Sequence, residues 1–259
     1  MSTFLFDEII FGPVNSRRLG VSLGINLLPT DSKFCNFNCI YCECGWTPGR
    51  GQMKSDFHST EVVINKLEEF LKNYLANGKN IDTITFAGNG EPTLHPQFEE
   101  VIDETIRLRN TYYPKAKISV LSNATMLHSE KVVNALKKID NRILKLDAGL
   151  NETALLMNQP LGKYSIDKII EQFKKFNGDF IVQTMFLKGE SNGQKIDNTS
   201  PNEIEVYLDL ISKIRPQKVM IYTIARDTPA EQLEKIPLET LNQIADKIKT
   251  LNITVEVSG

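Results

Sequence analysis

Short apolar runs alternate along this chain with longer segments in which apolar residues recur every three or four positions. The runs are rich in isoleucine, valine, leucine or threonine and are bounded by polar or turn-forming residues, as β-strands are. The longer segments carry one apolar stripe at a period of 3.6 residues, which is typical of amphipathic helices. The pattern predicts strands at residues 22–28, 81–87, 117–122, 142–147, 180–187, 218–224 and 253–257, and helices around residues 63–74, 129–136, 165–176, 204–211 and 241–251, with a further helix beginning near His95 and Pro96.

Alternating strands and helices build a parallel sheet through right-handed crossovers. The chain has about six or seven such units, fewer than the eight that close a full barrel. We therefore predict an α/β fold, an incomplete parallel βα barrel of about six to seven units, with a doubly wound open sheet as the alternative. The sequence shows no linker or repeat, so residues 1–259 are predicted to form one domain, with residues 1–21 as an N-terminal extension packed on the barrel.

Composition is ordinary for a soluble globular protein. The 259 residues are 41% hydrophobic and 24% charged, enough for a sizeable core. The net charge of −2 gives no overall basic field for nucleic acid, although it does not exclude a local basic groove. No apolar run approaches the roughly 20 residues of a membrane span, and the first residues contain Asp7 and Glu8 but no basic residue, unlike a secretory signal. We expect a cytoplasmic protein without a membrane partner.

Four cysteines lie within ten residues. The first three, Cys35, Cys39 and Cys42, have the spacing C-x3-C-x2-C. Thiolates are the usual ligands of iron–sulfur clusters, so these three are predicted to hold three irons of one [4Fe–4S] cluster. The fourth iron would then be open to a small molecule.

A structural zinc site is the alternative, with Cys44 as its fourth ligand. Cys42 and Cys44 are only one residue apart, which is awkward for chelation of one metal, and the three histidines show no paired spacing. Disulfides are disfavoured because four cysteines within ten residues cannot staple a domain of this size. We therefore predict that Cys44 is not a ligand and that the polar loop at residues 47–59 covers the cluster.

Glycine and polar residues collect at the predicted carboxyl ends of several strands, where ligands bind in parallel βα folds. The glycines after the second strand allow a close backbone approach to a ligand. The asparagine after the third strand also suits a left-handed turn, so a local structural role is its alternative. The residues concerned are Gly88, Asn89, Gly90 and Glu91 after the second strand and Ser122 and Asn123 at the third.

The fourth strand carries Lys145 and Asp147. Because strand side chains alternate in direction, both are predicted to point into the barrel while Leu144 and Leu146 face the helices. A buried charge needs a partner, so Lys145 and Asp147 either pair with each other or reach a ligand. Weaker candidates follow on later strands, namely Gln183 or Thr184, and Arg226 as a substrate-anion contact or a surface charge.

Together these motifs resemble the radical S-adenosylmethionine (SAM) superfamily. Tyr41 stands directly before Cys42, where that family usually has an aromatic residue near the adenine, and residues 89–92 resemble its Gly-Gly-Glu-Pro element with Asn89 in place of the first glycine. The resemblance implies that the open iron binds the amine and carboxylate of SAM, and that one electron splits SAM into methionine and a 5′-deoxyadenosyl radical. It places Tyr41, Gly88, Asn89, Gly90, Glu91, Ser122, Asn123, Lys145 and Asp147 around SAM.

The N-terminal segment resembles that of a smaller group within this superfamily. Gly-Pro-Val at 12–14, Ser-Arg-Arg at 16–18 and Ser-Leu-Gly at 22–24 recur in radical SAM proteins similar to the enzymes of wybutosine synthesis on transfer RNA. Those enzymes carry further cysteines for a second cluster, whereas only Cys44 is left over here, so we expect a single-cluster enzyme. Arg17 and Arg18 are candidates for the SAM carboxylate, a substrate phosphate, another domain's carboxylate or a structural salt bridge.

The resemblance leaves three substrate classes open: a modified RNA base, a glycyl-radical enzyme or other peptide, and a small molecule. It also implies an electron donor such as flavodoxin or ferredoxin. A non-catalytic iron–sulfur redox sensor or interaction module is the alternative function. A sensor needs the cysteines but not a cofactor pocket around them, so polar residues converging at the strand ends would favour the enzyme.

Overall fold

A computed structural model describes residues 4–16, 18–49, 51–53 and 56–259, so Arg17 lies outside the described residues. Its main sheet has eight strands, which are β1 (Ile10–Ser16), β2 (Gly20–Ile25), β3 (Thr83–Phe86), β4 (Lys117–Ser122), β5 (Asn141–Lys145), β6 (Ile181–Met185), β9 (Lys218–Tyr222) and β11 (Thr254–Ser258). They lie in the order β1-β2-β3-β4-β5-β6-β9-β11. The seven predicted strands correspond to β2 and all those after it.

The strands of this sheet lie side by side in chain order. All neighbours are parallel except β1, which pairs antiparallel with β2. A doubly wound sheet reverses its strand order at a switch point, and this order never reverses. The predicted incomplete barrel is therefore confirmed, and the doubly wound alternative is wrong. β1 comes from the predicted N-terminal extension and adds an edge to the sheet; the division into one domain and an extension stays a prediction.

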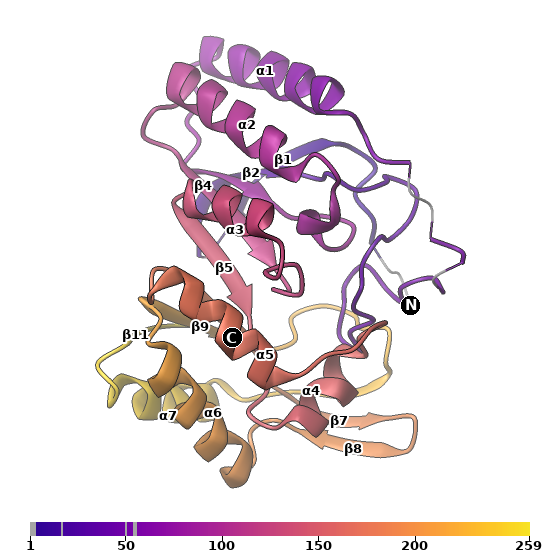
Figure 1. The fold of residues 1–259 in the computed structure, drawn as a ribbon, viewed down its shortest axis with the longest axis vertical. Coiled ribbons are helices and arrows are strands. Elements are labelled where there is room, and N and C mark those ends of the chain that lie inside the picture. The colour runs from indigo at the N-terminus through magenta and orange to yellow at the C-terminus, as the bar shows by residue number, and fades with distance from the viewer. Residues whose placement is uncertain (1–3, 17, 50, 54–55) are drawn as a thin grey trace.

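Helices cover the outer face of the curved sheet (Figure 1). Leu67 and Leu71 on the stripe of the first helix are fully buried in the same core as Leu23 and Ile25 of β2. Burial of one such side chain stabilises a fold by about 1.5–3 kcal/mol, so this interface fixes the helix on the sheet. The helices are α1 (Thr60–Ala76), α2 (Phe98–Tyr112), α3 (Glu130–Lys137), α4 (Asn151–Asn158), α5 (Ile166–Phe173), α6 (Pro201–Ile214) and α7 (Leu238–Lys249), with 3-10 turns at Pro92–Leu94 and Lys174–Phe176.

The predicted helical stripes are confirmed in α1, α3, α5, α6 and α7. α2 begins at Phe98, two residues after Pro96, with Gln97 as its N-cap. α4 was not predicted, because it has only eight residues and its apolar residues, Ala154 to Met157, are consecutive rather than spaced at the helical period. Within the described parts of the chain, no helix is long and apolar enough to cross a membrane.

A second sheet of three strands, in the order β10-β7-β8, was also not predicted. It consists of β7 (Leu187–Ser191), β8 (Gln194–Asp197) and β10 (Gln232–Lys235), and the β7–β8 hairpin projects at the lower edge of Figure 1. Most of its residues are exposed or half-buried. They therefore lack the apolar run by which strands are predicted from sequence.

The inner face of the half-barrel has an apolar layer below a polar rim. Ile143, Ile181 and Met220 from β5, β6 and β9 pack together with Leu19. Leu144 and Leu146 belong instead to the core under the helices, as the alternation of strand side chains predicts. The polar side chains above this layer, at the carboxyl ends of the strands, form the candidate site.

Candidate functional site

The cysteine loop is fixed at the carboxyl edge of the half-barrel, directly after β2. The Phe34 N–H donates to the Asn89 carbonyl at 2.8 Å, and the Glu91 N–H donates to the Phe34 carbonyl at 3.1 Å, which joins the loop to the end of β3. On the other side, the Ile40 N–H donates to the Met157 carbonyl at 3.0 Å. The cysteines are thus held between β3 and α4.

The three predicted ligand cysteines suit an iron–sulfur cluster. Cys35 and Cys39 are buried, Cys42 is half-buried, and none is in a disulfide. Burial raises the pKa of Cys35 to about 12 and also raises the pKa of Cys39, so each keeps its proton until a metal displaces it. Among the residues that the structure describes, no three His, Cys, Asp or Glu side chains are grouped around one metal ion. A [4Fe–4S] cluster does not need that convergence, because each thiolate binds a different iron.

Lys33 places a buried ammonium beside these cysteines, and sequence reasoning did not identify it. Lys33 is 3% exposed, and its Nζ donates to the Gly45 carbonyl at 2.7 Å, which closes the loop. Burial alone would lower the pKa of Lys33, but Cys42, Cys35 and Cys39 outweigh it and raise that pKa. One cation therefore stabilises the thiolate form of all three. The position of Lys33, two residues before Cys35, was the signal in the sequence by which it could have been found.

Cys44 differs from the other three cysteines. A hydrogen bond between the two side chains, as the largest effect, lowers the pKa of Cys42 well below its usual value and raises that of Cys44. The Cys44 thiol donates to the Gly88 carbonyl oxygen at 3.4 Å. Cys44 thus keeps its proton and is a neutral neighbour of Cys42, one of the three predicted ligands.

Glu91 joins the carboxyl ends of β3 and β4. Its Oε1 accepts from the Thr93 N–H at 3.1 Å and from the Ser122 hydroxyl at 2.9 Å, and its Oε2 accepts from the Asn123 N–H at 2.6 Å. Burial raises the pKa of Glu91 in spite of these donors. The Asn123 side-chain amide lies 3.9 Å from the Cys35 sulfur. The structure therefore brings Glu91, Ser122 and Asn123 together beside a cysteine, and it also gives Glu91 a structural role.

Asn89 is buried and ties the N-terminal segment to the site. Its Oδ1 accepts from the Phe6 N–H at 2.8 Å, and its Nδ2 donates to the carbonyls of Phe6 and Pro29, both at 2.9 Å. Its backbone N–H and carbonyl are bonded to Asn26 and Phe34. The SAM contact predicted for Asn89 stays a prediction, and a polar contact would have to replace one of these bonds.

Gly90 has no room for a side chain. Its φ is +139°, and an added Cβ would lie 1.9 Å from the carbonyl oxygen of Phe34. Gly90→Ala is expected to lower the free energy of unfolding by about 2 kcal/mol, as measured by urea unfolding. Gly51→Ala is the matched control, because a Cβ at Gly51 meets nothing within 4 Å. Equal stability of the two variants would contradict this packing.

Lys145, Asp147 and Tyr41 form a buried cluster at the end of β5. The Tyr41 hydroxyl donates to the Asp147 carboxylate. The Lys145 Nζ donates to the Tyr41 hydroxyl oxygen at 2.6 Å and lies 3.5 Å from the Asp147 Oδ2. Burial, followed by the charge of Asp147, raises the pKa of Tyr41 well above its usual value, so this hydroxyl stays protonated. Lys145 and Asp147 thus point into the barrel together and pair with each other.

The same cluster reaches the cysteine loop. The Lys145 Nζ lies 3.6 Å from the Cys39 sulfur, and the Cys39 thiol donates to the Asn158 Oδ1 at 3.3 Å. Burial alone would lower the pKa of Lys145, but Asp147 and Cys39 raise it well above its usual value, so the ammonium stays charged. Asn158 was missed from the sequence because it belongs to α4, far along the chain from Cys39.

The weaker candidates on the later strands differ in the direction of their side chains. The Thr184 hydroxyl donates to the Leu146 carbonyl at 2.7 Å and bonds the Tyr207 hydroxyl of α6 at 2.7 Å, so Thr184 faces outward. Gln183 is therefore on the inner face, by the alternation of the strand. Arg226 pairs with Glu43 at 2.7 Å on the surface.

Comparison with known proteins identifies the family. A family model described as the radical SAM superfamily matches residues 30–199. The chain belongs to the radical SAM superfamily. The resemblance inferred from the cysteine spacing and the strand-end motifs is thereby confirmed, whereas the ligand and SAM-contact assignments of individual residues stay predictions.

Three relatives of this chain differ in how much of their length it covers. A UPF0026 protein of Synechocystis is 30% identical over an alignment that covers 92% of this chain and 91% of that protein. A UPF0026 protein of Helicobacter pylori is 33% identical over 222 residues, 84% of this chain and 67% of the relative. A Brachyspira hyodysenteriae protein named GTPase Obg is 31% identical over 252 residues. That match covers 96% of this chain but 34% of the relative, so the chain spans about a third of that protein.

Solved structures share the fold at low sequence identity. A radical SAM methyltransferase from Sphaerobacter thermophilus has a TM-score of 0.66 at 13% identity, covering 92% of this chain and 65% of that one. SuiB from Streptococcus suis, bound to the precursor peptide SuiA, has a TM-score of 0.65 at 16% identity, covering 91% of this chain and 48% of the SuiB chain. TYW1 with a lysine-pyruvate adduct has a TM-score of 0.61 at 16% identity, covering 88% of this chain and 73% of the TYW1 chain. These likenesses establish the half-barrel fold and leave the substrate open.

Proposed function

We propose that this chain is a radical SAM enzyme with a single [4Fe–4S] cluster bound by Cys35, Cys39 and Cys42. The bound cluster would supply the electron that splits SAM, and the 5′-deoxyadenosyl radical so formed would take a hydrogen atom from the substrate. An electron donor such as flavodoxin or ferredoxin would deliver that electron. An RNA base, a peptide or glycyl-radical enzyme, and a small molecule remain the substrate classes.

The convergence of polar side chains on the cysteines supports this proposal most strongly. They come from the ends of three different strands, β3, β4 and β5. Asn123 approaches the Cys35 sulfur to 3.9 Å, and Lys145 approaches the Cys39 sulfur to 3.6 Å. A redox sensor would need the thiolates without this ring of buried groups, because buried polar groups cost free energy unless they serve a partner.

The surrounding residues would bind and orient SAM and exclude water. The carboxylate of Glu91 and the carbonyl groups near Gly88 and Gly90 would accept hydrogen bonds from the methionine ammonium. The Asp147 carboxylate would accept from a ribose hydroxyl, in competition with its Tyr41 donor. Lys145 and Lys33 would balance the negative charge of the thiolates.

The experiment that tests the proposal is anaerobic reconstitution with iron and sulfide, followed by dithionite and SAM. We expect 5′-deoxyadenosine by chromatography and a SAM-induced change in the EPR spectrum of the reduced cluster. Protein with about four irons that gives neither the product nor the spectral change would be a sensor rather than an enzyme. A spectral change without product would show that SAM binds and that the substrate must be present for cleavage.

Glu91→Gln separates SAM binding from cluster binding. It keeps the size of the side chain but removes the charge that would attract the methionine ammonium. We expect the iron content to stay near that of the native protein and the affinity for SAM to fall about tenfold or more, measured by equilibrium binding to the oxidised holoprotein. Glu69→Gln, at an exposed position of α1, is the matched control. Unchanged SAM affinity in Glu91→Gln would remove Glu91 from the pocket.

A further inference from the structure

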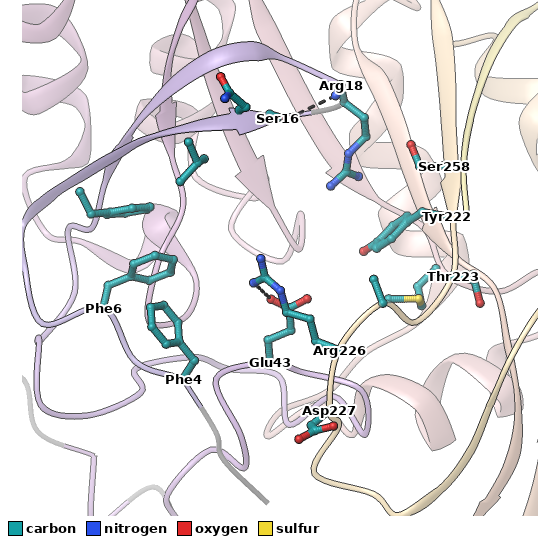
Figure 2. A pocket seen from close by; sticks show the side chains of 15 residues that line it. Phe4, Phe6, Ser16, Arg18, Glu43, Tyr222, Thr223, Arg226, Asp227 and Ser258 are labelled. Atoms are coloured by element: carbon teal, nitrogen blue, oxygen red, sulfur yellow. Dashed lines mark hydrogen bonds and ion pairs between the residues drawn. The ribbon is translucent and has the colours of Figure 1, made fainter.

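A pocket of about 730 Å³ opens at the seam between β1 and β11, the two edge strands of the half-barrel (Figure 2). Phenylalanines of the N-terminal segment line one side, and Tyr222 and Ser258 line the other. Burial raises the pKa of Tyr222 to about 12, with Lys145 opposing the shift and Asp147 adding to it. Met185 and Tyr222, which line the pocket, pack in the same cluster as Cys39 and Tyr41, so the pocket borders the candidate site.

Arg18 extends into this pocket with an unused donor. Its guanidinium lies over the ring of Tyr222, 4.9 Å from the ring centroid, and points into the space between Phe6 and Tyr222 in Figure 2. Its Nη1 is buried and has no hydrogen-bond partner among the described residues. A buried charged donor without an acceptor is costly. The guanidinium geometry matches a carboxylate or a phosphate, so an anionic group of a ligand would satisfy it.

The opposite wall presents fixed aromatic rings. Phe4 is 53% exposed, and its ring meets that of Phe6 edge-on at 4.9 Å between centroids. Phe6 in turn stacks on Phe11 at 3.7 Å. The Asn89 side chain holds the backbone of Phe6, and the Phe4 N–H donates to the Glu43 carbonyl at 3.0 Å. An exposed ring on an anchored wall is a surface for a planar aromatic group.

The charges around the pocket favour a single small anion. Of the charged residues that line it, Arg226 is paired with Glu43 at 2.7 Å, and Asp227 adds a negative charge. Among the described residues that line the pocket, Arg18 is thus the one cation without an ion-pair partner. Proteins bind the backbone of a nucleic acid through several cations at once. The described lining offers a single unpaired cation.

We infer that this pocket binds the substrate, and that the substrate is a small molecule with a planar aromatic ring and a carboxylate or phosphate group. The ring lies against the wall of Phe4 and Phe6, and the anionic group bonds the free Nη1 of Arg18. That the ligand is the substrate rests on the proposed function. The binding itself does not, so it is tested without turnover.

The test is a set of matched probes titrated into the reconstituted holoprotein with SAM and no reductant, followed by ligand-observed NMR. Phenyl phosphate and benzoate carry both a ring and an anion. Cyclohexyl phosphate lacks the aromatic ring, and phenol lacks the carboxylate or phosphate. Fragments of this size bind with Kd on the order of millimolar. We expect phenyl phosphate or benzoate to bind about tenfold more tightly than both controls, and whichever binds identifies the anionic group. Equal binding of all four probes, or no binding, would overturn the inference.

Variants assign the binding to this pocket. Arg18→Met is expected to lower the affinity for the preferred probe about tenfold, and Phe4→Leu is expected to lower it about threefold. Phe4 is exposed, so its variant tests the wall even where Arg18→Met fails to fold. Arg107→Met, on the exposed face of α2, is the matched control and should bind the probe as the native protein does.

Two outcomes would reassign the pocket. If Arg18→Met weakens the binding of SAM as much as it weakens the binding of the probe, the pocket holds the cofactor and the inference fails. If a short single-stranded RNA binds more tightly than the probes and loses that affinity in Arg18→Met, the ligand is a nucleic acid and the small-molecule inference fails. Because no step requires reductant, a protein that never cleaves SAM still gives a clear binding result.

Discussion

Cys35→Ala, Cys39→Ala and Cys42→Ala are each expected to lose the cluster, whereas Cys44→Ala is expected to keep it. Each of the first three would remove one of the three proposed protein ligands, and the remaining two would not hold the cube. Cys44 lowers the pKa of Cys42, and the Lys33 ammonium still stabilises that thiolate when Cys44 is absent. The expected iron content is about four per chain for the native protein and Cys44→Ala, and below about one for the other three variants.

Iron and sulfide analysis after anaerobic reconstitution measures this difference, and 5′-deoxyadenosine formation should fall to background in the same three variants. Cys44→Ala is the internal control, because it removes a thiol from the same loop. Loss of all iron in Cys44→Ala would show that Cys44 is a ligand. One tightly bound zinc per chain that requires all four cysteines would contradict the cluster assignment and support the structural zinc site.

Much of the fold was predictable because the parallel strands are buried on both faces. β3 and β6, for example, are buried along their whole length, and most of their residues are β-branched or apolar, which is the composition by which strands are recognised in a sequence. β1 and the β7–β8 hairpin are antiparallel and partly exposed, so their residues mix polar and apolar types without a clear period. β1 and β7 each pair with the next strand along the chain, so this mixed composition alone hides them. β10 is different, because it pairs with β7, which lies much earlier in the chain, and a local pattern does not contain that partner.

The candidate site was predictable where its residues lie at strand ends. Lys145 and Asp147 were identified because alternation along one strand directs both inward. Asn158 and Lys33 were missed for different reasons. Asn158 meets Cys39 only through the placement of α4. Lys33 stood next to the motif, but a lysine in a loop is usually exposed, and its burial at 3% follows from the way the loop folds back to Gly45.

The Lys145–Asp147 pair is largely withdrawn from solvent, and this makes it sensitive to substitution. The two side chains are 19% and 1% exposed. Asp147 also accepts from the Tyr41 hydroxyl and from the Met185 N–H at 3.0 Å. Removal of the carboxylate would leave the ammonium without its counter-charge and the Met185 N–H without an acceptor, and the Tyr41 hydroxyl would keep only its 3.4 Å bond to the Asn158 Oδ1. Breaking a buried pair in this way costs about 3–5 kcal/mol, and the partial exposure of Lys145 places this case near the lower end.

Asp147→Ala is therefore expected to lower the free energy of unfolding by about 3 kcal/mol in urea titrations of both the apoprotein and the reconstituted protein. Asp209→Ala is the matched control, since Asp209 pairs with Lys213 on the surface and exposed pairs contribute less than about 1 kcal/mol. The double variant Lys145→Met/Asp147→Ala should recover about half of the loss, because no uncompensated ammonium remains. If Asp147→Ala costs no more than Asp209→Ala, the buried pair does not stabilise the end of β5. If the double variant costs as much as the single one, the lost acceptor for Tyr41 and Met185 accounts for the effect, and the charge of Lys145 does not.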